Sequence, residues 1–372
     1  MTGMAVAAAS GGGGMHLHAA TDLAEKVAAL SRADFYGEPK RRGDGNDNIV
    51  CVETHMSWVF LTPQYAYKLK KPVRSHFLDF STLAAREHYC REELRLNRRL
   101  APSAYLEVLP LRRSEGRLQL DGNVGEIVDY LIKMNRLPTA KMLDRVLAEH
   151  TLRRGDLRAV MATLTKFYRH AEKAPMTPAQ YRARLTAAID DNRAQLCAPH
   201  YNLPQAQIAR ITAMQLDYVA TSDELAARAT HVVDAHGDLR PEHIYLGEPD
   251  LGEPVQIIDC LEFQSELRKL DPVDELSFLA LECARLGAPQ VGNALLRMYR
   301  VLSRDRVLPM LIAFYQSHRA LVRAALAIWH LDDTTVRDRE RWYNRALTYI
   351  DFAERAIDRE LPIGIGNDGR GR

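Results

Sequence analysis

The chain carries two short apolar stretches that hold a dense set of acidic and imidazole side chains: HVVDAHGDLRPEHIYL at residues 231–246 and PVQIIDCLEF at residues 254–263. Each stretch has the length and the β-branched content of a short strand beside a polar loop. Two acidic loops on adjacent strands can bring carboxylates to one point. Phosphoryl transfer needs such a point, because one carboxylate orients or deprotonates the attacking hydroxyl while another holds Mg²⁺ on the phosphates.

Asp238 and Asp259 are the two candidate carboxylates. An isolated His-Gly-Asp would be interpreted as a turn in which the aspartate caps backbone N–H groups. The second acidic strand favours a functional role for Asp238 instead. Asp259 ends the apolar run PVQIID, where a carboxylate costs free energy unless it is paired or bound to a metal. We therefore interpret both as site residues rather than as structural carboxylates.

The segments around these two stretches predict an α+β chain with an uneven order of elements. The region before residue 135 is rich in strands, with one long amphipathic helix at 79–100 and a short first helix at 21–33. Its strands are expected at 48–55, 57–62, 65–73, 105–113, 116–120 and 125–134. From Pro138 onward the pattern is helical apart from the two acidic stretches, with helices at 139–150, 155–172, 178–196, 204–228, 272–287, 289–303, 306–330 and 334–360.

This order predicts a two-lobed fold with a small β-rich N-lobe and a large, mostly helical C-lobe. We expect a disordered N-terminal tail over 1–20, the N-lobe over 21–135, the C-lobe over 136–362 and a flexible tail over 363–372. The short connector near 134–138 suggests a cleft between the lobes, where ligand sites often lie.

The composition excludes several classes of protein. The 372 residues include 47% hydrophobic and 26% charged residues, with a net charge of +2, so no large basic field for nucleic acid is expected. The apolar runs are too short for a membrane-spanning helix. The five cysteines are odd in number and form no C-x-x-C pair, which favours a reduced, cytoplasmic protein without structural zinc. The N-terminus is a weak signal-peptide candidate.

The segment H-G-D-x-x-x-x-H followed by I-D resembles the catalytic segment of the aminoglycoside phosphotransferase-like kinases, which have the protein-kinase-like fold. The stretches ETHMSWVFLT (53–62), YAYKLKKPV (65–73), LDFSTL (78–83), EELRLNRRLAP (92–102) and IIDCLEF (257–263) look more narrowly like an uncharacterised bacterial branch of that family. The resemblance covers roughly residues 21–330. It implies a small-molecule kinase that transfers the γ-phosphate of ATP or GTP to a hydroxyl, with Mg²⁺ or Mn²⁺ as metal.

The resemblance also implies roles for single residues. Asp238 stands at the catalytic aspartate that accepts or orients the acceptor hydroxyl, and His236 at the histidine that props its loop. Asp259 matches the aspartate that binds the Mg²⁺ bridging the β- and γ-phosphates. His243 stands where most of the wider family has asparagine, the second metal contact. Imidazole suits softer metals than Mg²⁺, so this departure puts two-metal binding or activity itself in doubt.

Glu262 has two open interpretations, a second metal ligand or a structural partner of Arg268. His243 is interpreted as lining the site rather than as a satisfied core histidine.

The nucleotide side of the site is expected in the N-lobe. Period-2 geometry places Ala66, Lys68 and Lys70 on one face of a strand. Ala66-x-Lys68 resembles the kinase arrangement, in which the small residue lies against adenine and the lysine reaches the α- and β-phosphates. Lys70 and Lys71 are expected to be solvated lysines on an edge strand. The partner of Lys68 is expected to be Glu93, which borders the buried stripe of the following helix, with Glu92 as the alternative.

The first two strands lack a G-x-G-x-x-G loop between them. Their connection, Glu53 to Ser57, could cap phosphates through its backbone amides and the hydroxyls of Thr54 and Ser57. Met134 fits the connector whose backbone would bind adenine.

The predicted partners are a nucleotide and a small-molecule acceptor, with no nucleic acid and no membrane. The alternative function is a weakly active or inactive nucleotide-binding pseudokinase that regulates a protein partner.

Overall fold

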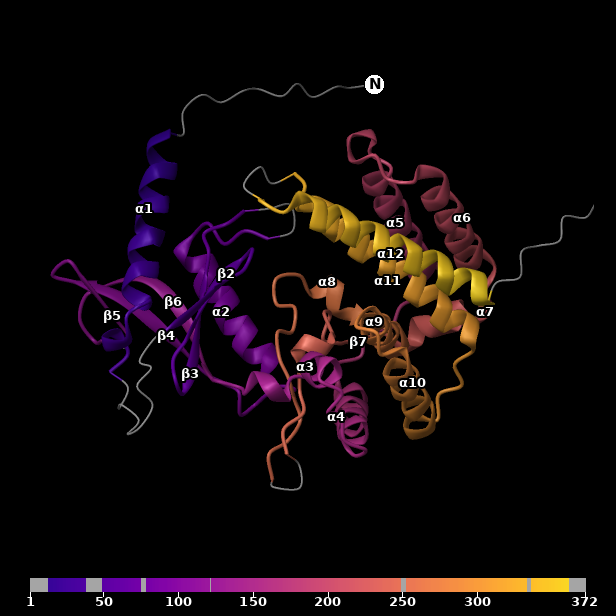
Figure 1. Ribbon diagram of the computed structural model, residues 1–372, viewed down its shortest axis with the longest axis horizontal. Helices are drawn as coiled ribbons and strands as arrows, with labels where there is room; N and C mark the ends of the chain where they lie inside the picture. The colour runs from indigo at the N-terminus through magenta and orange to yellow at the C-terminus, as the bar shows by residue number, and fades with distance from the viewer. Residues whose placement is uncertain are drawn as a thin grey trace, which may run out of the picture. The chain divides into compact units, whose positions relative to one another are not determined.

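The first unit is built on a six-stranded antiparallel sheet with the strand order β1-β2-β3-β6-β4-β5 (Figure 1). The strands are β1 (Val50–Glu53), β2 (Ser57–Leu61), β3 (Tyr65–Lys70), β4 (Tyr105–Ser114), β5 (Arg117–Leu120) and β6 (Glu126–Asn135). The computed structural model describes residues 13–37, 49–74, 78–120, 122–248, 252–332 and 336–360. It divides into two compact units, the first Met1–Pro138 with Glu262–Gln264 and the second Thr139–Leu261 with Ser265–Arg372.

Strand β3 lies inside the sheet and has both faces covered. It pairs with β2 on one side and with β6 on the other, with Ala66 opposite Met134 and Lys68 opposite Ile132. Tyr67 and Leu69 point into an apolar cluster that also holds Leu30, Phe60, Leu109, Leu111 and Leu131. The alternate positions of β3 face the other way, toward helix α2 (Leu83–Asn97), as the contacts of Lys68 and Lys70 with Glu93 show.

Helices α1 (Gly13–Leu30) and α2 cover opposite faces of this sheet (Figure 1). Helix α1 begins eight residues before the predicted start of the first helix, so residues 13–20, predicted as part of a tail, are helical. The rest of that predicted tail and the predicted tail at 363–372 lie outside the described residues.

The second unit is mostly helical. Its helices are η2 (Thr139–Lys141), α3 (Leu143–Ala148), α4 (Asp156–His170), α5 (Pro178–Leu196), η3 (Pro199–Tyr201), α6 (Gln205–Thr221), α7 (Asp223–Ala227), η4 (Arg228–His231), η5 (Pro241–His243), α8 (Ser265–Arg268), α9 (Pro272–Arg285), α10 (Pro289–Ser303), α11 (Pro309–Trp329) and α12 (Arg339–Glu360). Most of the long predicted helices of this region are present with ends within a few residues of the expected ones. The predicted helix at 204–228 is divided at Ser222, which caps α7, and the one at 139–150 is divided into η2 and α3.

The core of the helical unit forms where α11 packs against α12, α9 and α6. Leu321, Ala324 and Ile328 of α11 are buried there together with Phe278 of α9 and Tyr349 of α12. Helices α9 and α10 approach closely at Gly292, where an added Cβ would lie 2.6 Å from the Cα of Ala280. Among the described residues, no helix has the length and apolarity that crossing a bilayer requires.

Two short strand pairs position the acidic stretches within the helical unit. Strand β7 (Val233–Asp234) pairs with β10 (Lys269–Leu270), and β8 (Ile244–Tyr245) pairs with β9 (Gln256–Ile257), with Ile244 opposite Ile257. The predicted adjacency of the two acidic stretches is thereby confirmed. The α+β class, with one β-rich unit and one mostly helical unit, is confirmed as well.

Candidate active site

The loop that follows β7 has its shape set by Gly237 and Glu275. Gly237 has a φ of +90°, and a Cβ there would lie 3.0 Å from Cβ of Leu261 and 3.1 Å from Cγ of Arg268, so a side chain would be strained as well as crowded. The buried Glu275 carboxylate of α9 accepts hydrogen bonds from the backbone N–H of His236 at 3.0 Å and of Gly237 at 2.7 Å. Tyr168 donates a further bond to it at 2.8 Å.

His236 connects this loop with the second acidic stretch. Its Nδ1 accepts the backbone N–H of Asp238 at 3.3 Å, so its Nε2 carries the proton and donates to the carbonyl of Ile258 at 2.9 Å. The ring is fully buried. Burial lowers the pKa of His236 to about 3, and the ring is therefore neutral at physiological pH. This geometry fits the predicted role of a loop prop.

Two buried histidines predict a loss of stability in mild acid. Burial also lowers the pKa of His318 in α11, to about 4. In the unfolded chain a histidine has a pKa of about 6.5 and binds a proton below that pH, whereas the folded ring stays neutral. The free energy of unfolding is therefore highest above pH 6.5 and falls as the pH drops below it. Each of the two rings is expected to lower the free energy of unfolding by about 2 kcal/mol between pH 7 and pH 5. Urea unfolding of wild type and of His318→Gln at both pH values measures this, and equal pH dependence in the two proteins would contradict it.

Asp238 is ionised and held by a guanidinium. Its side chain is 25% exposed, and Arg240 contacts its Oδ2 through Nε at 3.1 Å and through Nη2 at 2.9 Å. Burial raises the pKa of this carboxyl, but Arg240, His243 and Arg323 outweigh burial and hold the pKa below its usual range. Asp238 is thus a charged acceptor at neutral pH, partly open to solvent.

Asp259 lies just after β9 and has an unusual backbone. Its φ is +62°, a left-handed conformation that a residue other than glycine adopts at an energetic cost, and such residues cluster at functional sites. Its side chain is 45% exposed, so the interpretation as a buried structural carboxylate is wrong. The Oδ2 of Asp259 lies 3.5 Å from Nε2 of His243, whose Nδ1 lies 3.9 Å from Oδ2 of Asp238. The structure therefore places the two predicted carboxylates on either side of one imidazole.

Both nitrogens of His243 are in use. Nδ1 lies 2.8 Å from the carbonyl oxygen of Asp238, and Nε2 lies 3.0 Å from Nη2 of Arg240. A guanidinium can only donate, so Nε2 accepts from Arg240 and Nδ1 donates to the carbonyl. In this arrangement the Nε2 lone pair is directed at a cation of the protein itself.

The third predicted metal ligand, Glu262, belongs to the first unit and ion-pairs with Lys70. Arg268 binds the Asp234 carboxylate at 2.7 Å, so of the two open interpretations of Glu262, the structural pair with Arg268 is wrong, because its partner is Lys70. Among the described residues, no group of three or more His, Cys, Asp and Glu side chains is arranged to hold a metal ion. Of the three predicted ligands, His243 and Glu262 contact cations of the protein, and Asp259 is a partly exposed carboxylate.

The β-rich unit brings two lysines onto one glutamate. The fully buried Glu93 carboxylate contacts Lys68 at 2.8 Å through Oε1 and Lys70 at 2.6 Å through Oε2. Glu92, the alternative partner, pairs with Arg95 on the outer face of α2 at 2.8 Å. The Lys70 side chain is only 1% exposed, so the expectation of a solvated edge-strand lysine is wrong, because β3 lies inside the sheet. Lys71 is also largely buried and ion-pairs with Glu53.

The other predicted nucleotide contacts lie around the same strands. The Thr54 hydroxyl accepts the backbone N–H of Ser57 at 2.9 Å and donates to the Ser57 carbonyl at 2.9 Å, which closes the turn between β1 and β2. The hydroxyl of Thr54 is therefore used within its own turn. Ala66 is buried and lies directly opposite Met134 in the β3–β6 ladder, so these two predicted adenine contacts are neighbours.

Sequence reasoning missed Glu275 and gave no role to Arg240. Glu275 lies within the run PVDELSFLALEC (272–283), all of which is buried in α9. An acidic residue inside such a run needs a polar partner, and that signal could have singled it out. Asp271, by contrast, caps α9, because its side chain accepts the backbone N–H of Val273 at 3.0 Å.

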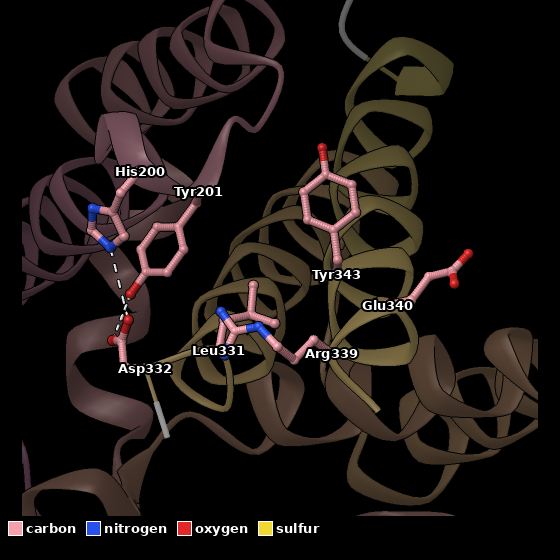
Figure 2. Close-up of a pocket in the computed structure, with 7 residues that line it drawn as sticks. All are labelled: His200, Tyr201, Leu331, Asp332, Arg339, Glu340 and Tyr343. Carbon is pink, nitrogen blue, oxygen red and sulfur yellow. Dashed lines mark hydrogen bonds and ion pairs between the residues drawn. The ribbon is translucent and has the colours of Figure 1, made fainter. Parts of the chain in front are cut away.

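A separate pocket in the helical unit contains none of the predicted site residues. It has a volume of about 330 Å³ and lies between η3, the end of α11 and the start of α12 (Figure 2). Tyr201 donates to the Asp332 carboxylate at 2.6 Å there, and His200 lies 3.8 Å from the same carboxylate. The candidate catalytic groups are thus in the loops around β7, β8 and β9 and not in this pocket.

Comparison with known proteins identifies the fold. A choline/ethanolamine kinase family protein from Mesorhizobium loti matches with a TM-score of 0.53 and 15% identity, covering 90% of this chain and 95% of that chain. Choline kinase LicA from Streptococcus pneumoniae matches with a TM-score of 0.50 and 13% identity, covering 90% and 99%. A thermostable mutant of aminoglycoside phosphotransferase APH(4)-Ia matches with a TM-score of 0.48 and 12% identity, covering 82% and 94%. The first two of these matches show that the chain has the protein-kinase-like fold, as the resemblance in its sequence implied.

Curated relatives by sequence are uncharacterised. Proteins of Mycobacterium tuberculosis (Rv2004c) and Mycobacterium bovis (Mb2027c) are each 32% identical over 277 residues, which is 73% of this chain and 53% of the relative. The chain thus spans about half the length of the curated relatives it matches. No protein-family model matches the chain.

Proposed function

We propose that the chain is a phosphotransferase that moves the γ-phosphate of ATP or GTP to a hydroxyl of a small molecule. The observation that carries this proposal is the pair of carboxylates on either side of His243. Asp238 is ionised and partly open, and Asp259 is exposed on a left-handed backbone. The fold supports the same class of reaction, because its neighbours include kinases of small molecules.

The proposed role of Asp238 is to receive the acceptor hydroxyl. The hydroxyl oxygen forms a bond to the γ-phosphorus, the bond from that phosphorus to the β–γ bridging oxygen breaks, and the nucleoside diphosphate leaves. The hydroxyl proton passes to the Asp238 carboxylate. Because the pKa of Asp238 is held low, its main contribution is to orient the hydroxyl and to stabilise charge at the moment of transfer. His236 and Glu275 keep the loop in the shape that this orientation requires.

Asp259 is the residue that would hold Mg²⁺, since a partly exposed carboxylate is the ligand type that hard cations prefer. When bound, the metal neutralises charge on the transferred phosphate. In the β-rich unit we assign Lys68 to the α- and β-phosphates, because its side chain is 15% exposed while Lys70 is closed off. Glu93 holds the Lys68 ammonium in place.

One observation favours the alternative of a nucleotide-binding regulator. The guanidinium of Arg240 is bound to Asp238, the group that would have to receive the hydroxyl. If that ion pair persists with nucleotide and acceptor bound, Asp238 cannot act and the chain would bind nucleotide without turnover. The two functions differ in one measurable quantity, the acceptor-dependent release of ADP.

Nucleotide affinity is expected to depend on Lys68. Lys68→Ala removes the ammonium that would contact the phosphates, and Glu93 keeps Lys70 as a partner, so the fold should survive. We expect the Kd for ATP to rise at least tenfold, which corresponds to about 1.4 kcal/mol. Isothermal titration with ATP and GTP measures the change and also decides between the two nucleotides.

Lys133→Ala is the matched control, because Lys133 lies opposite Tyr67 in the ladder and therefore on the other face of the sheet from Lys68. An unchanged ATP affinity in Lys68→Ala, or an equal loss in Lys133→Ala, would show that Lys68 is not the phosphate lysine.

A further inference from the structure

We infer that the guanidinium of Arg240 occupies the place of a second metal ion, so that the site takes up a single divalent cation together with the nucleotide. This inference rests on the proposed function and concerns the same site. It begins from the contacts of Arg240, which bridges three groups of the catalytic loop. Nε and Nη2 bind Asp238 at 3.1 and 2.9 Å, Nη2 lies 3.0 Å from Nε2 of His243, and Nη1 binds Glu242 at 2.6 Å.

These contacts use the atoms that a second ion would need. A metal bound by His243 requires the lone pair of a ring nitrogen, and Nδ1 is the donor to the Asp238 carbonyl. Only Nε2 has a lone pair, and it accepts from Arg240. Two carboxylate oxygens of the same loop, Oδ2 of Asp238 and Oε1 of Glu242, bind the same guanidinium. A metal bound through Nε2 of His243 could enter only by displacing Arg240.

The charges of the loop favour the guanidinium over an added cation. Asp238, Glu242 and Asp259 supply negative charge, and Arg240 is the cation in contact with two of them. The Arg240 side chain is only 18% exposed, so it is packed in place and its pairs are poorly screened by solvent. Moving it out would leave two carboxylates without their partner, a cost that a weakly bound second ion would have to overcome.

In the β-rich unit, too, a side-chain cation lies where a metal ion was predicted, at Glu262. Glu262, proposed from sequence as a second metal carboxylate, is bound to the ammonium of Lys70. Two of the three predicted metal ligands therefore hold a side-chain cation. Asp259 is a partly exposed carboxylate, the ligand type suited to the one ion that comes with the nucleotide.

Counting bound Mn²⁺ in the presence of the ATP analogue AMP-PNP tests this inference without relying on activity. Electron paramagnetic resonance of free Mn²⁺ gives the number of ions bound per chain. We expect one ion in the wild type. Arg240→Gln removes the charge and releases the carboxylates and Nε2 of His243, so two ions are expected. Arg240→Lys keeps a cation and should bind one. Arg285→Gln is the control, because Arg285 binds Glu282 at 2.7 Å instead of the loop, and it too should bind one.

Each outcome of this count has a defined meaning. Two ions in the wild type, or one in a folded Arg240→Gln protein, would overturn the inference while leaving the phosphotransferase proposal intact. If Arg240→Gln does not fold, His243→Asn decides, because Arg240 remains in it and one ion is expected. Two ions in His243→Asn would show that the imidazole, not Arg240, excludes the second ion. A wild type that binds neither AMP-PNP nor Mn²⁺ would contradict the proposed function itself.

Discussion

Asp238→Asn lowers kcat for phosphoryl transfer by at least about 100-fold, the size of effect typical of losing a general base. The change keeps the shape of the side chain and removes its charge. Because Asp238 acts on the acceptor in the transition state, the Kd for ATP should hardly change. Steady-state kinetics with an acceptor and isothermal titration with ATP give the two quantities from the same preparations.

A structural role for Asp238 makes the opposite forecast. An aspartate that only stabilises a turn would cost roughly 1 kcal/mol of stability when replaced and would spare turnover. Asp190→Asn serves as the control for a simple change of charge, since Asp190 is exposed on α5 and binds Arg193 at 2.9 Å. Equal kcat in wild type and Asp238→Asn would remove Asp238 from the catalytic role.

The largest loss of stability is expected for Lys70→Ala, at about 3–5 kcal/mol, the range for breaking a buried ion pair from one side. The substitution leaves the carboxylate of Glu262, whose side chain is 8% exposed, without its ion-pair partner and removes one of the two lysines from the fully buried Glu93. Lys68→Ala should cost much less, because Glu93 then keeps Lys70. Chemical denaturation of the full chain measures both losses.

The double variant Lys70→Met with Glu262→Gln provides the control for this account. It removes the negative charge of Glu262, which would have no ion-pair partner once Lys70 is replaced. The double variant should therefore recover a large part of the stability that Lys70→Met alone loses. A double variant as unstable as the single one would show that the loss comes from packing around Lys70 and not from the uncompensated carboxylates.

The period-2 pattern of β3 predicted that Ala66, Lys68 and Lys70 share a face, but it did not predict that Lys70 is buried. The burial of Lys70 depends on β6, which pairs with β3, and on α2, which covers one face of it, and both lie more than ten residues away in sequence. A pattern within one strand carries no information about which neighbours flank it. Glu93 was found from sequence because its position relative to Leu96 and Leu100 is a property of one helix.

The same limit explains the acidic loops. Their pairing through β8 and β9 followed from two short apolar runs close in sequence, and the structure confirms it. The partners of the loop did not follow, because Glu275 reaches the N–H groups of His236 and Gly237 from α9, which begins only at Pro272. Arg240 was visible in the sequence, but its choice of Asp238, Glu242 and His243 as partners depends on the turn that Gly237 and η5 impose.

The most direct test of the central claim is transfer of labelled phosphate from γ-³²P-ATP to a library of hydroxyl-bearing small molecules. Wild type and Asp238→Asn are compared at equal nucleotide saturation. The account predicts a labelled phosphate ester and matching ADP release with at least one acceptor in the wild type, and a loss of both in Asp238→Asn. A wild type that binds ATP but gives no acceptor-dependent label above the Asp238→Asn level would contradict the account and identify the chain as a nucleotide-binding regulator.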